Sequence, residues 1–233
     1  MAPYEIQDVV RSIDPDSTVL LFGAGSSIPS GAPSSQKIAE HLTKTFQQNS
    51  DGFSLAEVSE LVERKTGDRR ALVSAVRELF RSVEPTRGIL NIPRYDWKAI
   101  YTTNYDTLIE EAYGRHGVPL SVYDSNFDFR VRGNILTTKL YKLHGTINKD
   151  IVDGNNSRLV LTQGDYKHTQ DYRDKLFDAL KADLSEANII IIGQSLADPD
   201  IKAIINRAIA INETDLSGTN RVRPSPRACV LSA

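Results

Sequence analysis

The chain alternates short, strongly apolar runs with longer stretches in which apolar residues recur at helical spacing. Val19–Phe22 and Asn188–Ile192 are almost wholly apolar, as is typical of strands in a parallel sheet covered on both faces. Further strands are predicted over 97–101, 120–123, 140–143 and 228–231, and a long helix over 166–184. This alternation predicts an α/β fold with a Rossmann-like parallel sheet flanked by helices.

The segment between the first two predicted strands is helical in pattern throughout. Ser34 or Ser35 is the expected N-cap of a first helix, and two further apolar stripes cover 55–62 and 72–80. We interpret residues 36–92 as a helical insertion within one domain that spans 1–233. A compact domain rarely ends on a buried strand, so we also expect a further C-terminal region beyond the strand at 228–231.

Polar or glycine residues follow four of the predicted strands at once. These groups are Gly23-Ala24-Gly25-Ser26-Ser27, Thr103-Asn104-Tyr105-Asp106, His144-Gly145 and Gly193-Gln194-Ser195. In open parallel sheets, ligands bind in the crevice beyond the carboxyl ends of the strands. We therefore expect the four groups to converge on one site.

The turn at Gly23-Ala24-Gly25 has two interpretations. Glycine lets the backbone approach a pyrophosphate, but a tight turn required only for packing fits almost as well. The spacing departs from G-x-G-x-x-G because the next glycine is Gly31, and the lysine of a P-loop is absent. Asp51 lies between helical stretches rather than at the end of a second strand, which weakens the case for a hydride-transfer enzyme.

Three polar positions after strands suit proton transfer or ligand orientation. His144 stands at a strand end beside a glycine, a suitable place for a general base, although a lone histidine is more often structural. Asn104 and Asp106 flank Tyr105; a helix start explains one of them but not the whole set. Asp198-Pro199-Asp200 is interpreted as a helix start and nothing more.

Composition narrows the classes of function. A net charge of -2 gives no field that favours nucleic acid, so direct nucleic-acid binding is not expected. The single cysteine, Cys229, excludes a multi-cysteine zinc site, and we expect a reducing, cytoplasmic setting without a metal. The N-terminal residues lack the apolar core of a signal peptide, and the longest apolar runs are too short to cross a membrane.

Taken together, these motifs resemble the sirtuin superfamily. Its pattern runs Gly-Ala-Gly-x-Ser, Gly-x-Pro, Thr-x-Asn-x-Asp, His-Gly and Gly-x-Ser. In this chain the same order appears as Gly23 to Ser27, Gly31-Ala32-Pro33, Thr102 to Asp106, His144-Gly145 and Gly193-Gln194-Ser195. The five motifs span residues 19 to about 200, which is most of the chain.

The chain also departs from the deacetylase sirtuins. It lacks the two Cys-x-x-Cys pairs that hold zinc in those enzymes, and Ser34-Ser35-Gln36 replaces their Asp-Phe-Arg. The pattern is more similar to bacterial sirtuin-like NADase domains of antiphage defence, in which a helical insertion replaces the zinc module. The resemblance implies NAD+ as a substrate that is hydrolysed to ADP-ribose and nicotinamide, with no metal.

The resemblance also implies roles for individual residues. His144 would be the base, Asn104 would position water and ribose, and Asp106 would hold the nicotinamide carboxamide. The expected cofactor-binding residues are Gly23, Ala24, Gly25, Ser26, Ser27, Pro33, Thr103, Tyr105, Gly193 and Ser195. Gly193 and Ser195 would hold the adenosine side.

Two other functions stay open on the sequence. One is a sensor module that binds NAD+ or ADP-ribose without chemistry. The other is a nucleic-acid-directed partner subunit of a defence complex. Since an enzyme that destroys NAD+ needs control, we expect a homo-oligomer or a regulatory partner, such as an Argonaute-like protein or a helicase-like ATPase.

Overall fold

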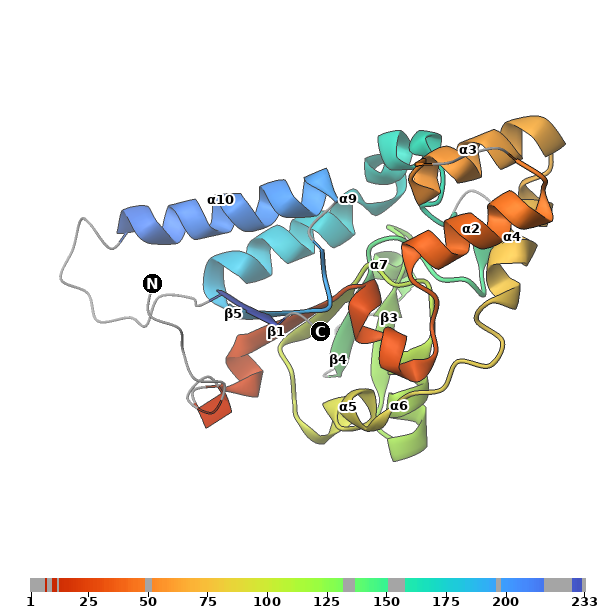
Figure 1. Ribbon diagram of the computed structural model, residues 1–233. Helices are drawn as coiled ribbons and strands as arrows, with labels where there is room; N and C mark the ends of the chain where they lie inside the picture. Colours follow the sequence, from red (N-terminus) through yellow and green to blue (C-terminus); the bar gives the residue numbers. More distant parts are fainter. Residues whose placement is uncertain are drawn as a thin grey trace.

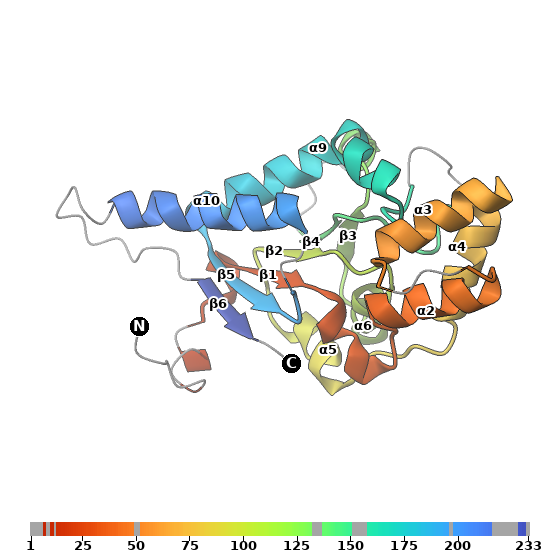
Figure 2. The same cartoon turned by 45° about the horizontal axis from the view of Figure 1, so that its top comes forward.

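The computed structural model describes residues 7, 10–11, 13–48, 52–131, 137–150, 158–195, 198–215 and 228–231. Its centre is a six-stranded sheet in the order β3-β4-β2-β1-β5-β6, and all the pairings are parallel. The strands are β1 (Thr18–Phe22), β2 (Ala99–Thr102), β3 (Leu120–Tyr123), β4 (Thr138–Lys142), β5 (Asn188–Ile192) and β6 (Ala228–Leu231). The predicted Rossmann-like parallel sheet is confirmed (Figure 2).

Helices cover both faces of this sheet, as the apolar runs indicate. Val19 and Leu21 pack with the helices α9 (Gln163–Glu186) and α10 (Pro199–Asp215). Leu20 and Phe22 point to the opposite face. The helices there are α5 (Arg87–Leu90) and α6 (Leu108–His116). β1 is therefore buried on both sides, which explains why its sequence does not alternate.

Three helices form a separate layer beside the sheet, as Figure 1 shows. They are α2 (Ser35–Thr45), α3 (Leu55–Thr66) and α4 (Arg69–Glu78). The side chains of Ser34, Ser54 and Asp68 cap their N-termini. The buried apolar residues of the three helices pack together with Ile147, Leu159 and Leu161, and we call this set the helical cluster. The helical character predicted for this stretch is confirmed, with Ser34 as the first cap.

The remaining elements are short. They are the 3-10 turns at Pro15–Ser17, Ala24–Ser26, Ile28–Ser30 and Ile92–Arg94, and the one-turn helix α7 at Asp128–Val131. β2 begins two residues later than predicted, because the backbone amide of Trp97 donates to the carbonyl of Tyr95, 3.1 Å away, rather than to a neighbouring strand.

The long helix α9 begins at Gln163, where Thr162 and Asp165 form a capping box. Its backbone leaves helical geometry at Arg173, with φ -139° and ψ 15°. The buried Arg173 guanidinium donates to the carbonyls of Asp124 and Arg158. A charged group needs such partners when it is taken out of water, and the kink aims it at them.

The strand order reverses at β1, because strands are added on one side of β1 first and on its other side afterwards. After β1 the chain builds β2, β3 and β4 on one side and then β5 and β6 on the other. The loops after β1 and β5 therefore leave the sheet as neighbours, with the loops after β2 and β4 beside them. In open α/β sheets this is where ligands bind.

Candidate functional site

The turns after β1 and β5 touch through their backbones. The amide of Gly23 donates to the carbonyl of Ile192 at 3.0 Å, and the amide of Gly25 donates to Gly193 at 2.9 Å. A Cβ on Gly23 would lie 2.6 Å from the Cα of Gln194, and one on Gly193 would lie 2.1 Å from the nitrogen of Ser26. Close packing alone therefore requires these glycines. Their contact with a pyrophosphate stays a prediction.

Asn104 lies beneath this turn and bonds to it. Its buried Nδ2 donates to the carbonyl of Gly23 at 3.1 Å and to the hydroxyls of Ser26 and Ser27 at 3.2 and 2.9 Å. Its Oδ1 is also buried and has no hydrogen-bond partner among the residues that the structure describes. A buried acceptor of this kind costs free energy unless a ligand or water satisfies it.

The remaining residues near the turn make fewer contacts. Thr103 accepts a hydrogen bond from the side-chain amide of Gln194 at 3.1 Å, which joins the loops after β2 and β5. Ser195 is exposed, and Pro33 is half-buried just before α2. Sequence reasoning assigned no role to Gln194, although it lies inside the Gly-x-Ser motif.

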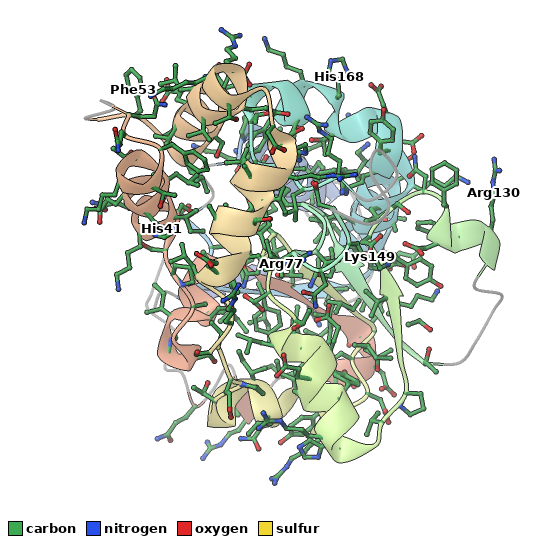
Figure 3. All side chains as sticks on the ribbon, turned by 90° about the vertical axis from the view of Figure 1, so that its right-hand side faces the viewer. His41, Phe53, Arg77, Arg130, Lys149 and His168 are labelled. Carbon is green, nitrogen blue, oxygen red and sulfur yellow. The ribbon has the colours of Figure 1, made fainter. Side chains whose placement is uncertain are left out.

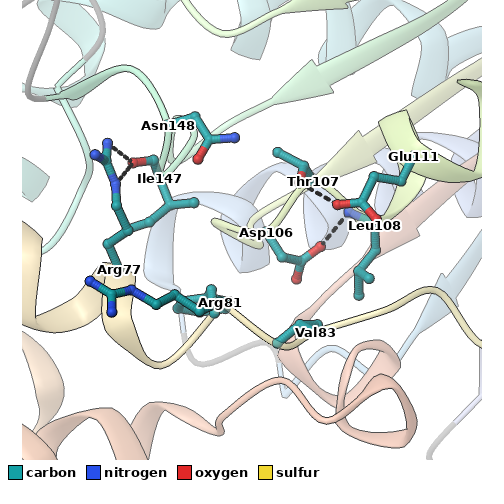
Figure 4. A pocket seen from close by; sticks show the side chains of 10 residues that line it. Arg77, Arg81, Val83, Asp106, Thr107, Leu108, Glu111, Ile147 and Asn148 are labelled. Carbon is teal, nitrogen blue, oxygen red and sulfur yellow. Dashed lines mark hydrogen bonds between the residues drawn. The ribbon is translucent and has the colours of Figure 1, made fainter.

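Asp106 lies two residues before α6 and also faces a pocket. Its Oδ1 accepts a hydrogen bond from the amide of Leu108, the first residue of α6, at 3.2 Å. The pocket, of about 220 Å³, lies beside the N-terminus of α6 (Figure 4). Arg77, Glu111 and Asn148 also contribute to its wall. Neither Asn104 nor the residues to which it donates hydrogen bonds line this pocket, so Asp106 and Asn104 have different surroundings.

A fully buried lysine holds the Asp106 loop. Lys142 is the last residue of β4, and its ammonium donates to the carbonyl of Asp106 and to Glu110 Oε1, the latter at 2.7 Å. Sequence reasoning missed Lys142. The available signal was a charged residue at the end of a strand that is otherwise buried.

Tyr105 points towards the helical cluster. Its hydroxyl donates to the carbonyl of Val160 at 2.7 Å, and its carbonyl accepts from the amide of Ile147 at 2.9 Å. Burial raises the pKa of its phenol well above the ordinary value, and nearby acidic groups add to the rise. The structure therefore places Tyr105 against the helical cluster, whereas Asn104 contacts the glycine turn.

His144 is paired with a carboxylate. Its Nε2 lies 2.7 Å from Asp198 Oδ2, and the two side chains are only 6% and 9% exposed. The ring of Tyr166 meets the imidazole edge-on, with centroids 5.5 Å apart. Burial alone would raise the pKa of Asp198. The hydrogen bond and charge of His144 and two backbone amides outweigh it and lower that pKa.

This pairing corrects the interpretation of Asp198 as a helix start and nothing more. Its Oδ1 does cap α10, accepting from the amides of Asp200 and Ile201 at 2.9 and 3.2 Å. Its other oxygen serves His144. The sequence shows the cap but not the partner, since the two residues are 54 positions apart.

A charged network anchors the loop that carries His144. The carbonyl of His144 accepts from the amide of Val160 at 3.1 Å. Arg69 of α4 holds the preceding residue, donating to the carbonyl of Leu159 at 2.8 Å. Arg69 also pairs with Asp150 at 2.8 Å and Asp165 at 3.1 Å. This set connects the helical insertion, α9 and the His144 loop.

The site combines an amide, two serine hydroxyls and an imidazole–carboxylate pair at the carboxyl ends of parallel strands. Such groups can orient a ligand that carries several hydroxyls and can accept a proton. In the part of the chain that the structure describes, no cluster of three or more His, Cys, Asp or Glu could hold a metal ion. No described helix is long and apolar enough to cross a membrane.

Sequence comparisons point in one direction. The family described as "SIR2-like domain" matches residues 98–226, more than half of the chain. The NAD(+) hydrolase ThsA of Bacillus cereus (strain MSX-D12) is 25% identical over 221 residues, which cover 90% of this chain and 44% of that protein. Defense-associated sirtuin 2 of Bacillus subtilis is 24% identical over 209 residues, 86% of this chain and 20% of that protein. The chain thus spans less than half the length of these relatives.

Solved structures show the same fold. A structure described as "Sir2 bound to acetylated peptide" is similar at a TM-score of 0.55 and 13% identity, over 98% of this chain and 87% of that chain. Another, described as "The Structural basis of Sirtuin Substrate Affinity", is similar at 0.54 and 17% identity, over 89% and 84% of the two chains.

Proposed function

This chain belongs to the SIR2-like domain family, and from that premise we propose that it is an NAD+ hydrolase. The reaction is cleavage of the bond between nicotinamide and ribose, which gives ADP-ribose and nicotinamide. The curated relatives named NAD(+) hydrolase ThsA support this activity. So does the sirtuin-like order of the motifs at the strand ends.

The placement of Asn104 is the observation that carries the proposal. Its Nδ2 is committed to the glycine turn, which fixes the amide, while its buried Oδ1 has no partner among the described residues. An acceptor held in this way suits a ribose hydroxyl or the water that attacks the sugar. A purely structural asparagine would satisfy both ends of its amide.

The chemistry needs orientation and a base more than a strong acid. Breaking the bond places positive charge on the ribose, and the pyridinium leaves as neutral nicotinamide. His144 would accept a proton from water or from a ribose hydroxyl, and Asn104 would position them. Asp106 would hold the carboxamide of nicotinamide. The turn from Gly23 to Ser27 would receive the pyrophosphate and its ribose.

The other predicted contacts are proposed for the rest of the dinucleotide. Gly193 and Ser195 would hold the adenosine side, with Pro33, Thr103 and Tyr105 around the ligand. The hydroxyl of Tyr105 is already bonded to Val160, so Tyr105 would contribute through its backbone or ring edge. Gln194, which bridges to Thr103, joins this set.

The test is nicotinamide release from NAD+ by the 233-residue chain, with products identified by chromatography. We expect Asn104→Ala and His144→Ala each to reduce turnover by about 100-fold or more. The matched control is His168→Ala, since His168 lies on the outer surface of α9 and its side chain is 71% exposed (Figure 3). Wild-type turnover in either site variant would contradict the assignment, provided that thermal unfolding shows an intact fold.

A binding module without chemistry is the second candidate. The Asn104 observation favours a ligand but does not itself require turnover. Calorimetric titration with NAD+ and with ADP-ribose separates the two functions. A wild-type chain that binds either ligand and releases no nicotinamide would establish the sensor function instead.

The relatives also support a role in defence, since one of them is named Defense-associated sirtuin 2. We propose that this chain is an effector of antiphage defence that depletes NAD+. Control by a homo-oligomer or a partner protein follows from the toxicity of such an activity. Light scattering with and without NAD+ measures the assembly. Turnover that does not change with protein concentration would argue against control by self-association.

A further inference from the structure

The geometry points to Asp198 as a positioning residue for His144: its carboxylate holds the imidazole with Nε2 protonated, so that Nδ1 is the atom that accepts the proton. This inference rests on the proposed NAD+ hydrolase function. It assigns the reacting nitrogen of His144, and it adds Asp198, which the sequence pattern indicates only as a helix cap, to the residues of the proposed site.

The imidazole is held from two sides. Nε2 lies 2.7 Å from Asp198 Oδ2, and the Tyr166 ring meets the imidazole at an interplanar angle of 82°. Since both partners of the pair are nine-tenths buried, water competes little for the hydrogen bond. These contacts restrict both the position and the rotation of the ring.

Asp198 is itself held rigidly. Its Oδ1 accepts from the amides of Asp200 and Ile201, so only Oδ2 is directed at His144. A carboxylate that caps a helix cannot rotate without breaking those bonds. The start of α10 therefore sets the orientation of the imidazole, through one side chain that performs both tasks.

The choice of nitrogen follows from the chemistry of the pair. An ionised carboxylate only accepts hydrogen bonds, so Nε2 must carry a proton and the lone pair of a neutral ring lies on Nδ1. In the reaction, Nδ1 takes a proton from water while the water oxygen bonds to the ribose C1′ and the bond to nicotinamide breaks. The imidazolium that forms is stabilised by Asp198, which keeps its charge.

Asp198→Asn separates positioning from capping. Asparagine caps a helix about as well as aspartate, but it removes the charge and allows the opposite tautomer of the ring. We expect kcat to fall by about 10²- to 10⁴-fold with KM for NAD+ changed by less than about threefold, because ground-state binding is retained.

The matched control is Asp68→Asn. Asp68 caps α4 in the same way, accepting from the amides of Arg70 and Ala71, and it is exposed away from His144. This variant should leave kcat unchanged. A fall in kcat as large as that of Asp198→Asn would show that loss of a cap carboxylate, rather than loss of positioning, is being measured.

A double-variant cycle tests whether Asp198 acts through His144. If it does, Asp198→Asn has no further effect on kcat in a His144→Ala background, because the group that it positions is gone. Independent, multiplicative losses in the two single variants would overturn the inference.

Nitrogen NMR provides a readout that does not depend on activity. The chain has four histidines, so His144 can be assigned by comparison with His144→Ala. We expect the Nε2-protonated tautomer in the wild type and a change of tautomer in Asp198→Asn. An Nδ1-protonated neutral ring in the wild type would falsify the inference even if NAD+ hydrolysis is confirmed. A wild type without nicotinamide release would count against the proposed function alone, while the NMR result would still decide the pairing.

Discussion

Asn104 and His144 both follow buried strands of the same sheet, yet different interactions hold them. Neutral groups surround Asn104: a backbone carbonyl, two serine hydroxyls and glycines packed without room for a Cβ. Charged groups hold His144: the carboxylate of Asp198 and, one hydrogen bond further away, the Arg69 network. Neutral hydrogen bonds and close packing fix the first side of the site, and electrostatic pairing fixes the second.

This difference has consequences for how each side responds to change. Packing contacts are short-ranged and insensitive to pH, so the Asn104 side should tolerate a change of pH but not a larger side chain. Buried charges depend on every partner being present and ionised, so the His144 side should be sensitive to the loss of one group or to acid. Three measurements of stability test this contrast.

The largest effect is expected from Arg69→Met on the charged side. Arg69 is 15% exposed, and its loss leaves Asp150 and Asp165 buried with one partner fewer and the carbonyl of Leu159 without its donor. We expect the free energy of unfolding to fall by about 3–5 kcal/mol, measured by urea denaturation.

Its matched control is Arg64→Met in the neighbouring turn of α3. Arg64 is 76% exposed and pairs with Glu60 at 3.1 Å, a surface pair one helical turn apart. We expect its removal to cost less than about 0.5 kcal/mol. Similar losses of unfolding free energy in the two variants would mean that burial does not increase the contribution of the Arg69 network to stability.

An intermediate effect is expected from Gly193→Ala on the packed side. The residue has φ +64°, and an added Cβ would lie 2.1 Å from the nitrogen of Ser26. We expect a loss of more than about 2 kcal/mol in the free energy of unfolding, from strain and overpacking together. Gly117→Ala is the control, since Gly117 has φ +65° with no atom within 4 Å of the added Cβ. This variant should lose only about 1 kcal/mol of unfolding free energy. Equal losses in the two variants would show that close packing at Gly193 contributes nothing beyond backbone strain.

The smallest effect is the acid dependence of the His144 side. The lowered pKa of Asp198 in the folded chain means that its ionised form stabilises the fold. This contribution is complete above the ordinary value of 3.8 and is lost as pH falls through the lower folded pKa. The stability gap between wild type and Asp198→Asn should therefore be widest near neutral pH and close below pH 3.8. A gap that stays constant in urea titrations from neutral to acid pH would show that the carboxylate charge contributes nothing.

Much of the fold could be predicted because it follows from local patterns. The runs at Val19–Phe22 and Asn188–Ile192 are buried parallel strands, and Ser34 caps the first helix of the insertion. Strand boundaries were less accurate where the backbone turns before it enters the sheet, as it does where the amide of Trp97 bonds to Tyr95. The motifs at the strand ends located the candidate site, because parallel strands bring their carboxyl ends to one edge.

The partners within the site could not be predicted in the same way. Nothing near His144 in the sequence indicates Asp198, and nothing near Asp106 indicates that Lys142 holds its carbonyl. Arg69 is one of several charged residues in its stretch of the sequence, yet among the described residues it alone of Arg69 and Arg70 is paired with carboxylates from two other segments, Asp150 and Asp165. Charge patterns along a helix show which residues are polar but not what they meet across the fold.

The sequence by itself determined the strands, the helical insertion and the family resemblance, because hydrophobic periodicity, caps and short motifs act over a few residues. Only the tertiary structure decided that Gly23 and Gly193 press together, that Asn104 bonds to their turn and that Asp198 serves His144 as well as α10. These contacts depend on the order of the strands in the sheet. That order brings together residues far apart in the chain, which local sequence patterns do not specify.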